Sequence, residues 1–556
     1  MRLRILAFLL IVFAEVNANV SLQQVDPFLK ILPDNNNPGT FSTVQSVAHG
    51  DKLTIQLLLK TDENVKYTIA LRSSTLSSVL LGNIKKYRVG YVKVSPKIAH
   101  PASDQLKSSN QLYPDPLFQQ DTFSVTKNEP LPIILDIPVD AGIKPGLHTI
   151  KVSVSSASKK DVASASFSFH VYNVTVPVSK LNYIAWYHDA DYRLMNGGKD
   201  VPPFSDLYWK IFKNIVKAAK ENGQNTFTIN QLFLIKFLKT KDNKFSADFT
   251  QFDKAVNIIL KEVGMKYVNC RQFAARLGGW DAPFGLTFPK FYGDVYYMNN
   301  AAIGDAEAST FYNWFIPAYY AHLKLNNYTG KILQHIADEP IEANKSSFIE
   351  IAKFIKGLAP DLTTIEAIQT MDVAPYIDII VILLDQLPGA YPAIQKLQQN
   401  PDKKVWFYTC NAPQWEYANR FIEFPLLKTT LLPWIASRYN LDGYLHWALD
   451  FWGDAPYEDA SIVKFGASQM EFPGGDAWLF YPAYQTVNIS VRSLAMRNGI
   501  TDVALLNLLR RKRPADAERI NNDLIKSFNQ YNLNTKDYFN KKQEILTLLS
   551  LGNKIQ

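Results

Sequence analysis

The sequence predicts a two-part α/β protein, in which an antiparallel β-sandwich precedes a (β/α)8-type barrel. Three observations lead to this fold class. Apolar residues alternate with polar ones in short runs from residue 19 to residue 177. After Val178, segments with helical spacing alternate with short apolar runs. Polar and aromatic residues gather where those runs end, as they do at the active face of such barrels.

The first 18 residues have the pattern of a signal peptide. Arg2 and Arg4 precede an apolar run over 5–14, and the small residues that end at Ala18 suit cleavage there. The run is short for a bilayer span, no later stretch is both long and uncharged, and no cysteine follows it to accept a lipid. We therefore expect a secreted or periplasmic protein without an integral membrane segment.

Residues 19–177 are predicted to form the β-sandwich, as an accessory domain. Glycine and proline interrupt its apolar runs at short intervals, and no polar constellation is found in it. The alternating residues are Leu53, Ile55, Leu57 and Leu59; Ile150, Val152 and Val154; and Phe167, Phe169 and Val171.

Residues 178–489 are predicted to form the catalytic barrel, with a helical segment over 490–556 packed on it. The predicted helices cover 207–222, 252–263, 311–325, 346–358, 391–399 and 425–439. The predicted strands cover 183–186, 226–229, 267–270, a run from 332, 364–367, 377–384, 405–409 and 443–447.

The run from Ile332 to Pro340 ends in two adjacent acids, Asp338 and Glu339. Successive strand side chains point to opposite faces, so both acids can face one pocket only where the strand ends. Pro340 favours a chain that is extended at the pair and turns after it. Two close carboxylates repel when both are ionised, so we expect one raised pKa, at Glu339, and a proton donor beside an anion. An exposed acidic loop is the plain alternative.

Other polar and aromatic residues follow the remaining predicted strands. Their common placement indicates a functional site, although each alone has an ordinary structural explanation. They are Tyr187, His188, Asp189, Asn230, Arg271, Asp385, Cys410, Asn411, Trp447, Asp450 and Trp452.

Several segments in order resemble glycoside hydrolase family 123, whose known activity is that of a β-N-acetylgalactosaminidase. The resemblance extends over about residues 180–510, with departures at Ala477, Ala483, Leu494 and around 428–430. The similar segments are 335–340 with the acidic pair, 406–413, 442–447 with Trp452, 475–482, 490–492 and 497–502.

The resemblance implies substrate-assisted hydrolysis with retention. Glu339 would protonate the glycosidic oxygen, and Asp338 would hold the 2-acetamido group as its oxygen attacks C1. The resemblance also implies a substrate-binding set of Tyr408, Trp447, Trp452, His335, Arg271 and Asp450. Removal of terminal β-linked N-acetylgalactosamine from a glycan or glycoconjugate is the expected activity.

Three other classes stay open. Another barrel glycosidase would need a carboxylate nucleophile, for which Asp450 or Asp189 is the best candidate. A glycan-binding protein would need only the aromatic cleft. A metal hydrolase built on His188, Asp189 and Asp191 is more distant, because that cluster lacks a known ligand pattern. We expect neither a metal nor a cofactor.

The distribution of charge bears on which partners the protein binds, and the spacing of the two cysteines bears on whether they pair. The formal charge is +8, but the lysines are dispersed, and the basic run 510–513 suits the end of a helix. We therefore expect no nucleic-acid partner. Cys270 and Cys410 are expected to be buried free thiols, and a single disulfide between them is the alternative that spacing leaves open.

Overall fold

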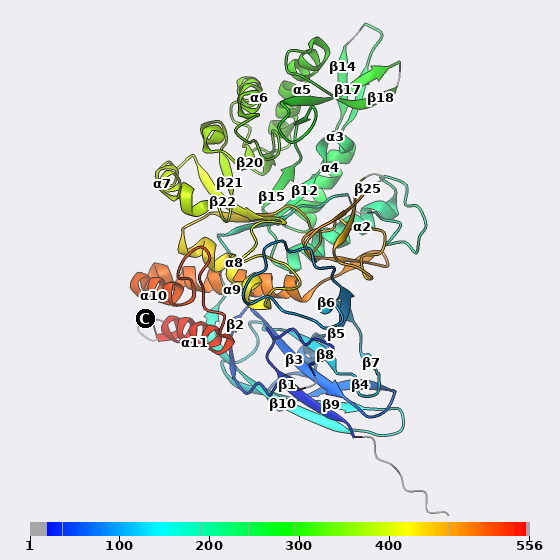
Figure 1. Cartoon of the computed structure of the whole chain (residues 1–556), viewed down its shortest axis with the longest axis vertical. Helices are drawn as coiled ribbons and strands as arrows, with labels where there is room; N and C mark the ends of the chain where they lie inside the picture. The colour runs from blue at the N-terminus through cyan, green and yellow to red at the C-terminus, as the bar shows by residue number, and fades with distance from the viewer. Residues whose placement is uncertain are drawn as a thin grey trace, which may run out of the picture.

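The structure is a computed structural model that describes residues 19–35, 37–189, 191–242, 244–293, 295–465 and 468–551. The predicted signal peptide lies outside the described residues. The chain forms a mixed α/β molecule with β-sheets of the N-terminal part at one end and the helices and parallel strands at the other (Figure 1).

Two five-stranded sheets make up the N-terminal part. In order across the first sheet lie β1 (Ser21–Val25), β3 (Lys52–Lys60), β8 (Leu131–Pro138), β5 (Lys85–Lys93) and β6 (Leu112–Gln119). In order across the second lie β2 (Gln45–His49), β10 (Ala163–Thr175), β9 (Gly146–Ser155), β4 (Val65–Arg72) and β7 (Thr122–Val125). The short helix α1 (Ser78–Gly82) follows β4.

The alternating residues of these strands form one buried cluster shared by the two sheets. Ile55 and Ile133 of the first sheet belong to the same cluster as Val152 and Phe169 of the second. The expectation of a wholly antiparallel arrangement is wrong at one edge, because β2 pairs with β10 in parallel. These two strands are far apart in sequence, so no tight turn forces them to be antiparallel.

All pairings within two further sheets are parallel. The five-stranded sheet has the order β11 (Asn182–Ala185), β23 (Gly443–His446), β22 (Lys404–Thr409), β21 (Ile379–Leu383) and β20 (Ile365–Ile368). The three-stranded sheet has the order β12 (Thr226–Ile229), β15 (Tyr267–Cys270) and β19 (Ile332–Gln334). An isolated parallel bridge joins Gln334 to Thr364 beside β20. Each strand lies within or overlaps one of the predicted runs.

Helices connect these strands, and all of them except α3 and η2 overlap a predicted helix. They are α2 (Asp206–Glu221), α3 (Gln231–Leu234), α4 (Thr250–Asn257), the π-helical turn η1 (Ile258–Glu262), α5 (Ala306–Leu325), α6 (Lys345–Leu358), the 3₁₀ turn η2 (Met371–Tyr376), α7 (Leu387–Leu397) and α8 (Leu426–Arg438). Ser205 caps α2 by accepting a hydrogen bond from the Tyr208 amide. Gly223, just beyond that helix, has φ 96°, and a Cβ there would lie 2.9 Å from Ile500.

Two β insertions were not predicted. One is the hairpin β13 (Lys236–Lys239) and β14 (Phe245–Asp248), and the other is the three-stranded sheet β16 (Ala274–Arg276), β17 (Phe284–Tyr292) and β18 (Val295–Ala301). They lie at the end of the molecule far from the N-terminal sheets (Figure 1). Two short hairpins follow β23: β24 (Ile462–Phe465) with β25 (Ser468–Glu471), and β26 (Tyr481–Ala483) with β27 (Thr486–Asn488).

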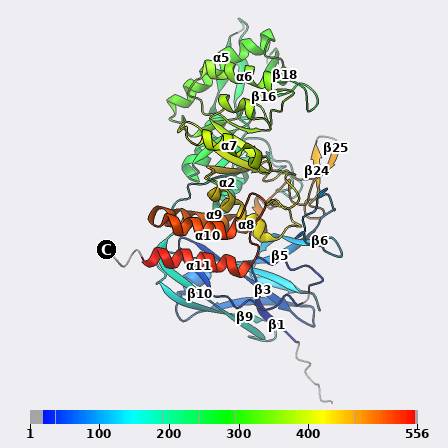
Figure 2. The same cartoon turned by 60° about the vertical axis from the view of Figure 1, so that its left-hand side comes forward.

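Three helices follow Ser490 within the described residues and lie between the two parts of the molecule (Figures 1 and 2). They are α9 (Val491–Lys512), α10 (Pro514–Leu524) and α11 (Thr535–Leu551). Ser490 caps α9, and the basic run occupies its last turn, where cations suit the helix dipole.

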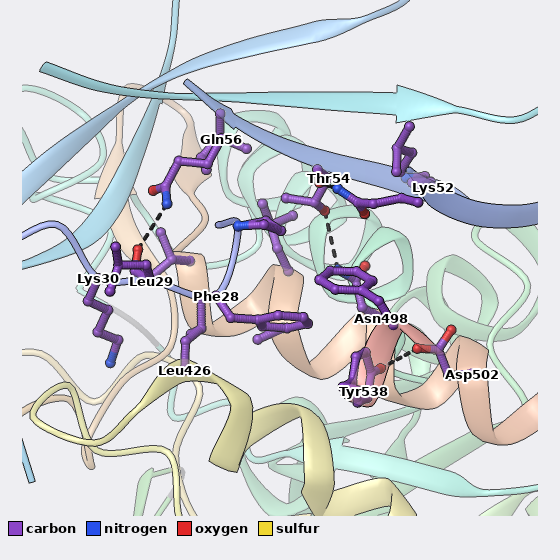
Figure 3. Close-up of a pocket in the computed structure, with 18 of the residues that line it drawn as sticks. Phe28, Leu29, Lys30, Lys52, Thr54, Gln56, Leu426, Asn498, Asp502 and Tyr538 are labelled. Atoms are coloured by element: carbon purple, nitrogen blue, oxygen red, sulfur yellow. Dashed lines mark hydrogen bonds between the residues drawn. The ribbon is translucent and has the colours of Figure 1, made fainter. Parts of the chain in front are cut away.

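Polar contacts join the N-terminal sheets to α9 and α11 around a small enclosed cavity of about 40 Å³ (Figure 3). The Asn498 amide donates to the Thr54 hydroxyl at 3.2 Å. The Lys542 ammonium lies 2.7 Å from Asp51 and 2.8 Å from Asp502. These contacts bridge residues of β3, α9 and α11, so the N-terminal sheets and the helices share a buried polar interface.

Two further sequence expectations can be compared with the structure. Cys270 and Cys410 are both free, as predicted. No helix in the described part of the chain is both long enough and apolar enough to cross a membrane.

Candidate active site

Asp338 and Glu339 follow β19 and line the wall of a cavity of about 490 Å³, here called the acid cavity. Its lining residues are Trp186, His188, Trp280, Asp338, Glu339, Ala367, Tyr408, Cys410, Asn411, Leu445, Trp447, Phe451 and Phe472. A second cavity of about 660 Å³, here called the arginine cavity, contains Arg271, Arg276 and His335 in its lining. Asp338 and Trp186 line both cavities, so the two adjoin at the acidic pair.

The backbone at the pair differs from the expectation of an extended chain. Glu339 has φ 48°, in the left-handed region that residues with a Cβ seldom adopt, so the chain turns at Glu339 itself. Two hydrogen bonds hold this turn: the Glu339 amide donates to the Ala367 carbonyl at 3.1 Å, and the Arg276 guanidinium donates to the Glu339 carbonyl at 2.8 Å. Strained backbone held by its surroundings is a frequent feature of functional sites.

Within the pair, Asp338 has a strongly raised pKa. Burial raises the pKa of Asp338 to about 8, and the nearby charges of Glu339 and Glu366 act in the same direction. His335 and Arg276 lower it by smaller amounts. The Asp338–Glu339 pair therefore retains a proton at neutral pH, as expected for two close carboxylates.

The Glu339 carboxylate accepts two hydrogen bonds. The Tyr408 hydroxyl donates to its Oε1, and the Gln369 amide donates to the same oxygen at 3.1 Å. Gln369 in turn accepts from Gln386 at 2.8 Å. Burial and the neighbouring acids raise the pKa of Tyr408 well above its usual value, so this hydroxyl keeps its proton. The donors fix the position of Glu339 in the acid cavity.

Glu366, the second residue of β20, is a buried acid that the sequence reasoning missed. It accepts hydrogen bonds from the amides of Ile336 and Ala337 at 2.8 and 2.9 Å, and its Oε1 is hydrogen-bonded to the Nδ1 of the His335 ring at 2.7 Å. These contacts hold the segment that leads into the acidic pair. A charged residue within the apolar run 364–367 was the available signal, because acids are seldom buried without partners.

The structure separates the two predicted tryptophans. Trp447 lines the acid cavity, and its indole N–H donates to the buried Asp476 carboxylate at 2.9 Å. Trp452 is not among the lining residues of either cavity, and its N–H donates to the Phe480 carbonyl at 2.8 Å. Phe451, one residue earlier, lines the acid cavity instead.

Arg271 and His335 line the arginine cavity, whereas Asp450 lines neither cavity. Arg271 donates to the Tyr187 carbonyl at 2.9 Å and lies 3.8 Å from Asp189. The buried Asp450 accepts from the His188 amide at 2.9 Å, and burial raises its pKa to about 8. Asp450 therefore supports the backbone beneath the cavities and does not face them.

Among the residues that the structure describes, no group of three or more His, Cys, Asp or Glu side chains is placed to hold a metal ion. The polar side chains of the two cavities are instead arranged around the acidic pair. A carboxyl pair that retains a proton, in a cavity walled by aromatic rings, is typical of a glycoside hydrolase.

Comparison with known proteins agrees with this class. Residues 195–509, more than half of the chain, match the model of the glycoside hydrolase 123 catalytic domain. The chain therefore belongs to glycoside hydrolase family 123. No curated protein matches it.

The similar solved structures include a family 123 glycoside hydrolase from Clostridium perfringens, described for glycolipid glycan hydrolysis, with a TM-score of 0.70 and 17% identity. The alignment covers 96% of this chain and 97% of that one, so the two share a fold. A family 5 mannosidase from Rhizomucor miehei has 15% identity over 59% of this chain and 94% of that one, with a TM-score of 0.30. A β-glucuronidase from Parabacteroides merdae has 9% identity over 78% and 47%, with a TM-score of 0.26. These last two likenesses are too weak to support an argument.

Proposed function

We propose that this glycoside hydrolase removes terminal β-linked N-acetylgalactosamine by substrate-assisted hydrolysis with retention. The observation that carries the proposal is the lining of the acid cavity, which contains Asp338, Glu339, Tyr408 and Trp447 together. An acid, an anion, a hydroxyl donor and an aromatic wall are the groups that this reaction needs.

In the first step the 2-acetamido oxygen attacks C1 and the bond from C1 to the leaving oxygen breaks. Glu339 gives its proton to that leaving oxygen, and a cyclic oxazolinium forms. Asp338 accepts a hydrogen bond from the acetamido N–H and stabilises the positive charge. In the second step water attacks C1, Glu339 takes a proton from the water, and the ring opens with net retention.

Substrate binding selects where the shared proton of the pair lies. The acetamido N–H donates more strongly to an ionised Asp338 than to a protonated one, so binding favours the charged form of that residue and leaves the proton on Glu339. The substrate thereby converts a coupled pair into a distinct acid and a distinct anion.

In a conventional retaining glycosidase, a carboxylate separate from the Asp338–Glu339 pair would line the cavity as the nucleophile. Asp189 and Asp450 line neither cavity, which favours the acetamido oxygen in this role. A protein that only binds glycans would not need a carboxyl pair that retains a proton.

We also propose that the eight parallel strands close as a (β/α)8 barrel, with residues 19–177 as a β-sandwich and residues 490–556 as a packed helical segment. Parallel pairing of β11 with β23, and the bridge from Gln334 to Thr364, support this closure. The signal-peptide pattern of residues 1–18 supports export.

The test is the turnover of three aryl β-glycosides by the purified protein: the N-acetylgalactosaminide, its gluco epimer and the parent galactoside. We expect hydrolysis of the first and at least about a hundredfold lower kcat/KM for the galactoside, which lacks the internal nucleophile. Comparable rates on the galactoside would rule out obligate acetamido participation.

A further inference from the structure

Trp280 is an exposed tryptophan at the rim of the acid cavity. It lies in the loop between β16 and β17, its side chain is 53% exposed, and it lines the same cavity as Glu339. Its place in the lining of the cavity that holds Glu339, rather than its exposure alone, distinguishes this indole from other exposed aromatic residues.

Arg276 fixes the position of this ring relative to the acid. Its guanidinium carbon lies 3.9 Å from the centre of the Trp280 ring, and its Nε donates to the Trp280 carbonyl at 2.9 Å. The same guanidinium donates to the Glu339 carbonyl at 2.8 Å. The buried Asn344 amide also donates to the Trp280 carbonyl, at 3.2 Å. A ring held in this way loses little conformational freedom when a ligand packs against it.

The chemistry of the acid sets which part of a substrate lies near Trp280. Glu339 must reach the glycosidic oxygen, and it lines only the acid cavity. The group beyond that oxygen, the leaving group, therefore lies on the Glu339 side of the bond. Trp280 lies on the same side, because Arg276 contacts both the Trp280 ring and the Glu339 carbonyl.

We propose that Trp280 is the stacking platform for a leaving-group sugar, so that the substrates are glycans in which the terminal residue is linked to another pyranose. The apolar face of that pyranose packs on the open face of the indole, opposite Arg276. This inference rests on the proposed function and adds the part of the substrate that the catalytic pair does not contact.

The experiment compares two substrates and two matched variants. One substrate is a disaccharide with N-acetylgalactosamine β-linked to galactose, and the other is the trifluoroethyl β-N-acetylgalactosaminide, whose leaving group is activated but has no ring. Trp280→Ala removes the platform. Trp415→Ala is the control, because Trp415 is 51% exposed, stacks on His100 and lines neither cavity.

We expect Trp280→Ala to lower kcat/KM on the disaccharide by about tenfold and on the trifluoroethyl glycoside by less than about twofold. Trp280→Phe should recover part of the loss, and Trp415→Ala should alter neither substrate. Equal losses on both substrates would show that Trp280 only supports the loop. An unchanged rate on the disaccharide would also overturn the proposal.

A binding measurement separates this inference from the proposed function. If the native protein cleaves neither substrate, the proposed function fails, and calorimetry on the same proteins tests the platform directly. Trp280→Ala should then weaken disaccharide binding by about tenfold and leave free N-acetylgalactosamine binding unchanged. Equal disaccharide affinity in the native protein and the variant, or no disaccharide binding by either, would refute the platform.

Discussion

Arg492 and Asp115 form a two-pronged ion pair, although 377 residues separate them in the chain. The Arg492 Nε and Nη2 atoms donate to the two Asp115 carboxylate oxygens, each at 2.8 Å. Both side chains are fully buried. Asp115 belongs to β6 of the N-terminal sheets, and Arg492 lies in the first turn of α9.

The remaining donors of Arg492 hold the segment that supports the acid cavity. They reach the carbonyls of Arg420, Gly475 and Trp478 at 3.0, 2.7 and 2.9 Å. Asp476, between the last two of these, accepts the indole N–H of Trp447. Gly475 has φ 75°, and a Cβ there would lie 2.7 Å from the Arg492 guanidinium. Asp115 of the N-terminal sheets is thus connected, through Arg492 and the 475–478 segment, to Trp447 in the wall of the acid cavity.

Asp115→Asn should reduce both stability and activity. Loss of one partner leaves the Arg492 charge buried without its counter-ion, which costs about 3–5 kcal/mol of unfolding free energy. Because the 475–478 segment then loosens, kcat/KM on an aryl β-N-acetylgalactosaminide should fall by about tenfold or more even well below the melting temperature. Denaturant unfolding and steady-state kinetics measure the two effects.

Asp136→Asn is the matched control for that variant. Asp136 of β8 forms a similar buried pair with Arg497 of α9, at 2.7 and 2.9 Å, but the other side-chain hydrogen bonds of Arg497 go to Thr54 and Asn498 and not to the 475–478 segment. We expect a comparable loss of stability with kcat/KM within about twofold of the native value. An equal loss of activity in both variants would indicate a general effect of weakening the interface.

Glu339→Gln should impair hydrolysis most for glycosides whose leaving groups need a proton. General acid catalysis contributes about 10²–10⁴ in rate, so alkyl and sugar leaving groups should lose that factor while a dinitrophenyl glycoside loses much less. The measurement is kcat/KM across a series of leaving groups of decreasing basicity. A uniform loss across the series would argue against Glu339 as the acid.

The raised pKa of Asp338 predicts the alkaline limit of activity. Its pKa of about 8 means that the free pair keeps its proton below that pH and loses it above, so kcat/KM should fall as pH rises through about 8. Asp338→Asn removes the repulsion within the pair, and the alkaline limb should move to lower pH.

Asp450→Asn provides the control for the pH profile. The pKa of Asp450 is also raised to about 8, yet this residue lines neither cavity. The alkaline limb should stay in place in this variant. If the alkaline limb moved in Asp450→Asn and not in Asp338→Asn, Asp450 rather than Asp338 would set the alkaline limit of activity.

Fluorination of the acetamido group tests its role as nucleophile. Successive fluorine atoms weaken the carbonyl oxygen, so kcat should fall steeply through the mono-, di- and trifluoroacetyl substrates while binding changes far less. A thiazoline mimic of the cyclic intermediate should inhibit tightly, and Asp338→Asn should weaken that inhibition. A flat response, with a glycosyl ester trapped on an Asp or Glu, would show a protein nucleophile instead.

Features that depend on local pattern were predictable from the sequence. The strand that begins at Ile332 and its acidic end follow from apolar spacing, and so do the helix ending before Gly223 and the helical segment after Ser490. Trp447 was found because it follows a strand whose carboxyl end meets those of the other strands at one face, whereas Tyr408 was found only through the family resemblance.

Features that depend on distant partners were not predictable. No local sequence pattern indicates that Asp115 pairs with Arg492. The sequence from Trp447 to Trp452 also does not indicate which of its aromatic rings face a cavity. The left-handed turn at Glu339 arises from hydrogen bonds to Ala367 and Arg276, which come from other elements. The hairpin β13–β14 was overlooked because both of its strands have only four residues and are partly polar, and β16 has only three residues. The longer strands β17 and β18, of nine and seven residues, were also overlooked.

The wide sequence separation of Asp115 and Arg492 has a consequence for how the molecule assembles. Contacts between remote parts of a chain form slowly, because the entropy cost of closing a long loop comes before the contacts can stabilise the chain. The segment carrying Asp476 can settle only after strand β6 and helix α9 have met. The aromatic wall beside the catalytic acids should therefore be among the last regions to become ordered during folding, and a newly made chain acquires its secondary structure before it acquires a working pocket.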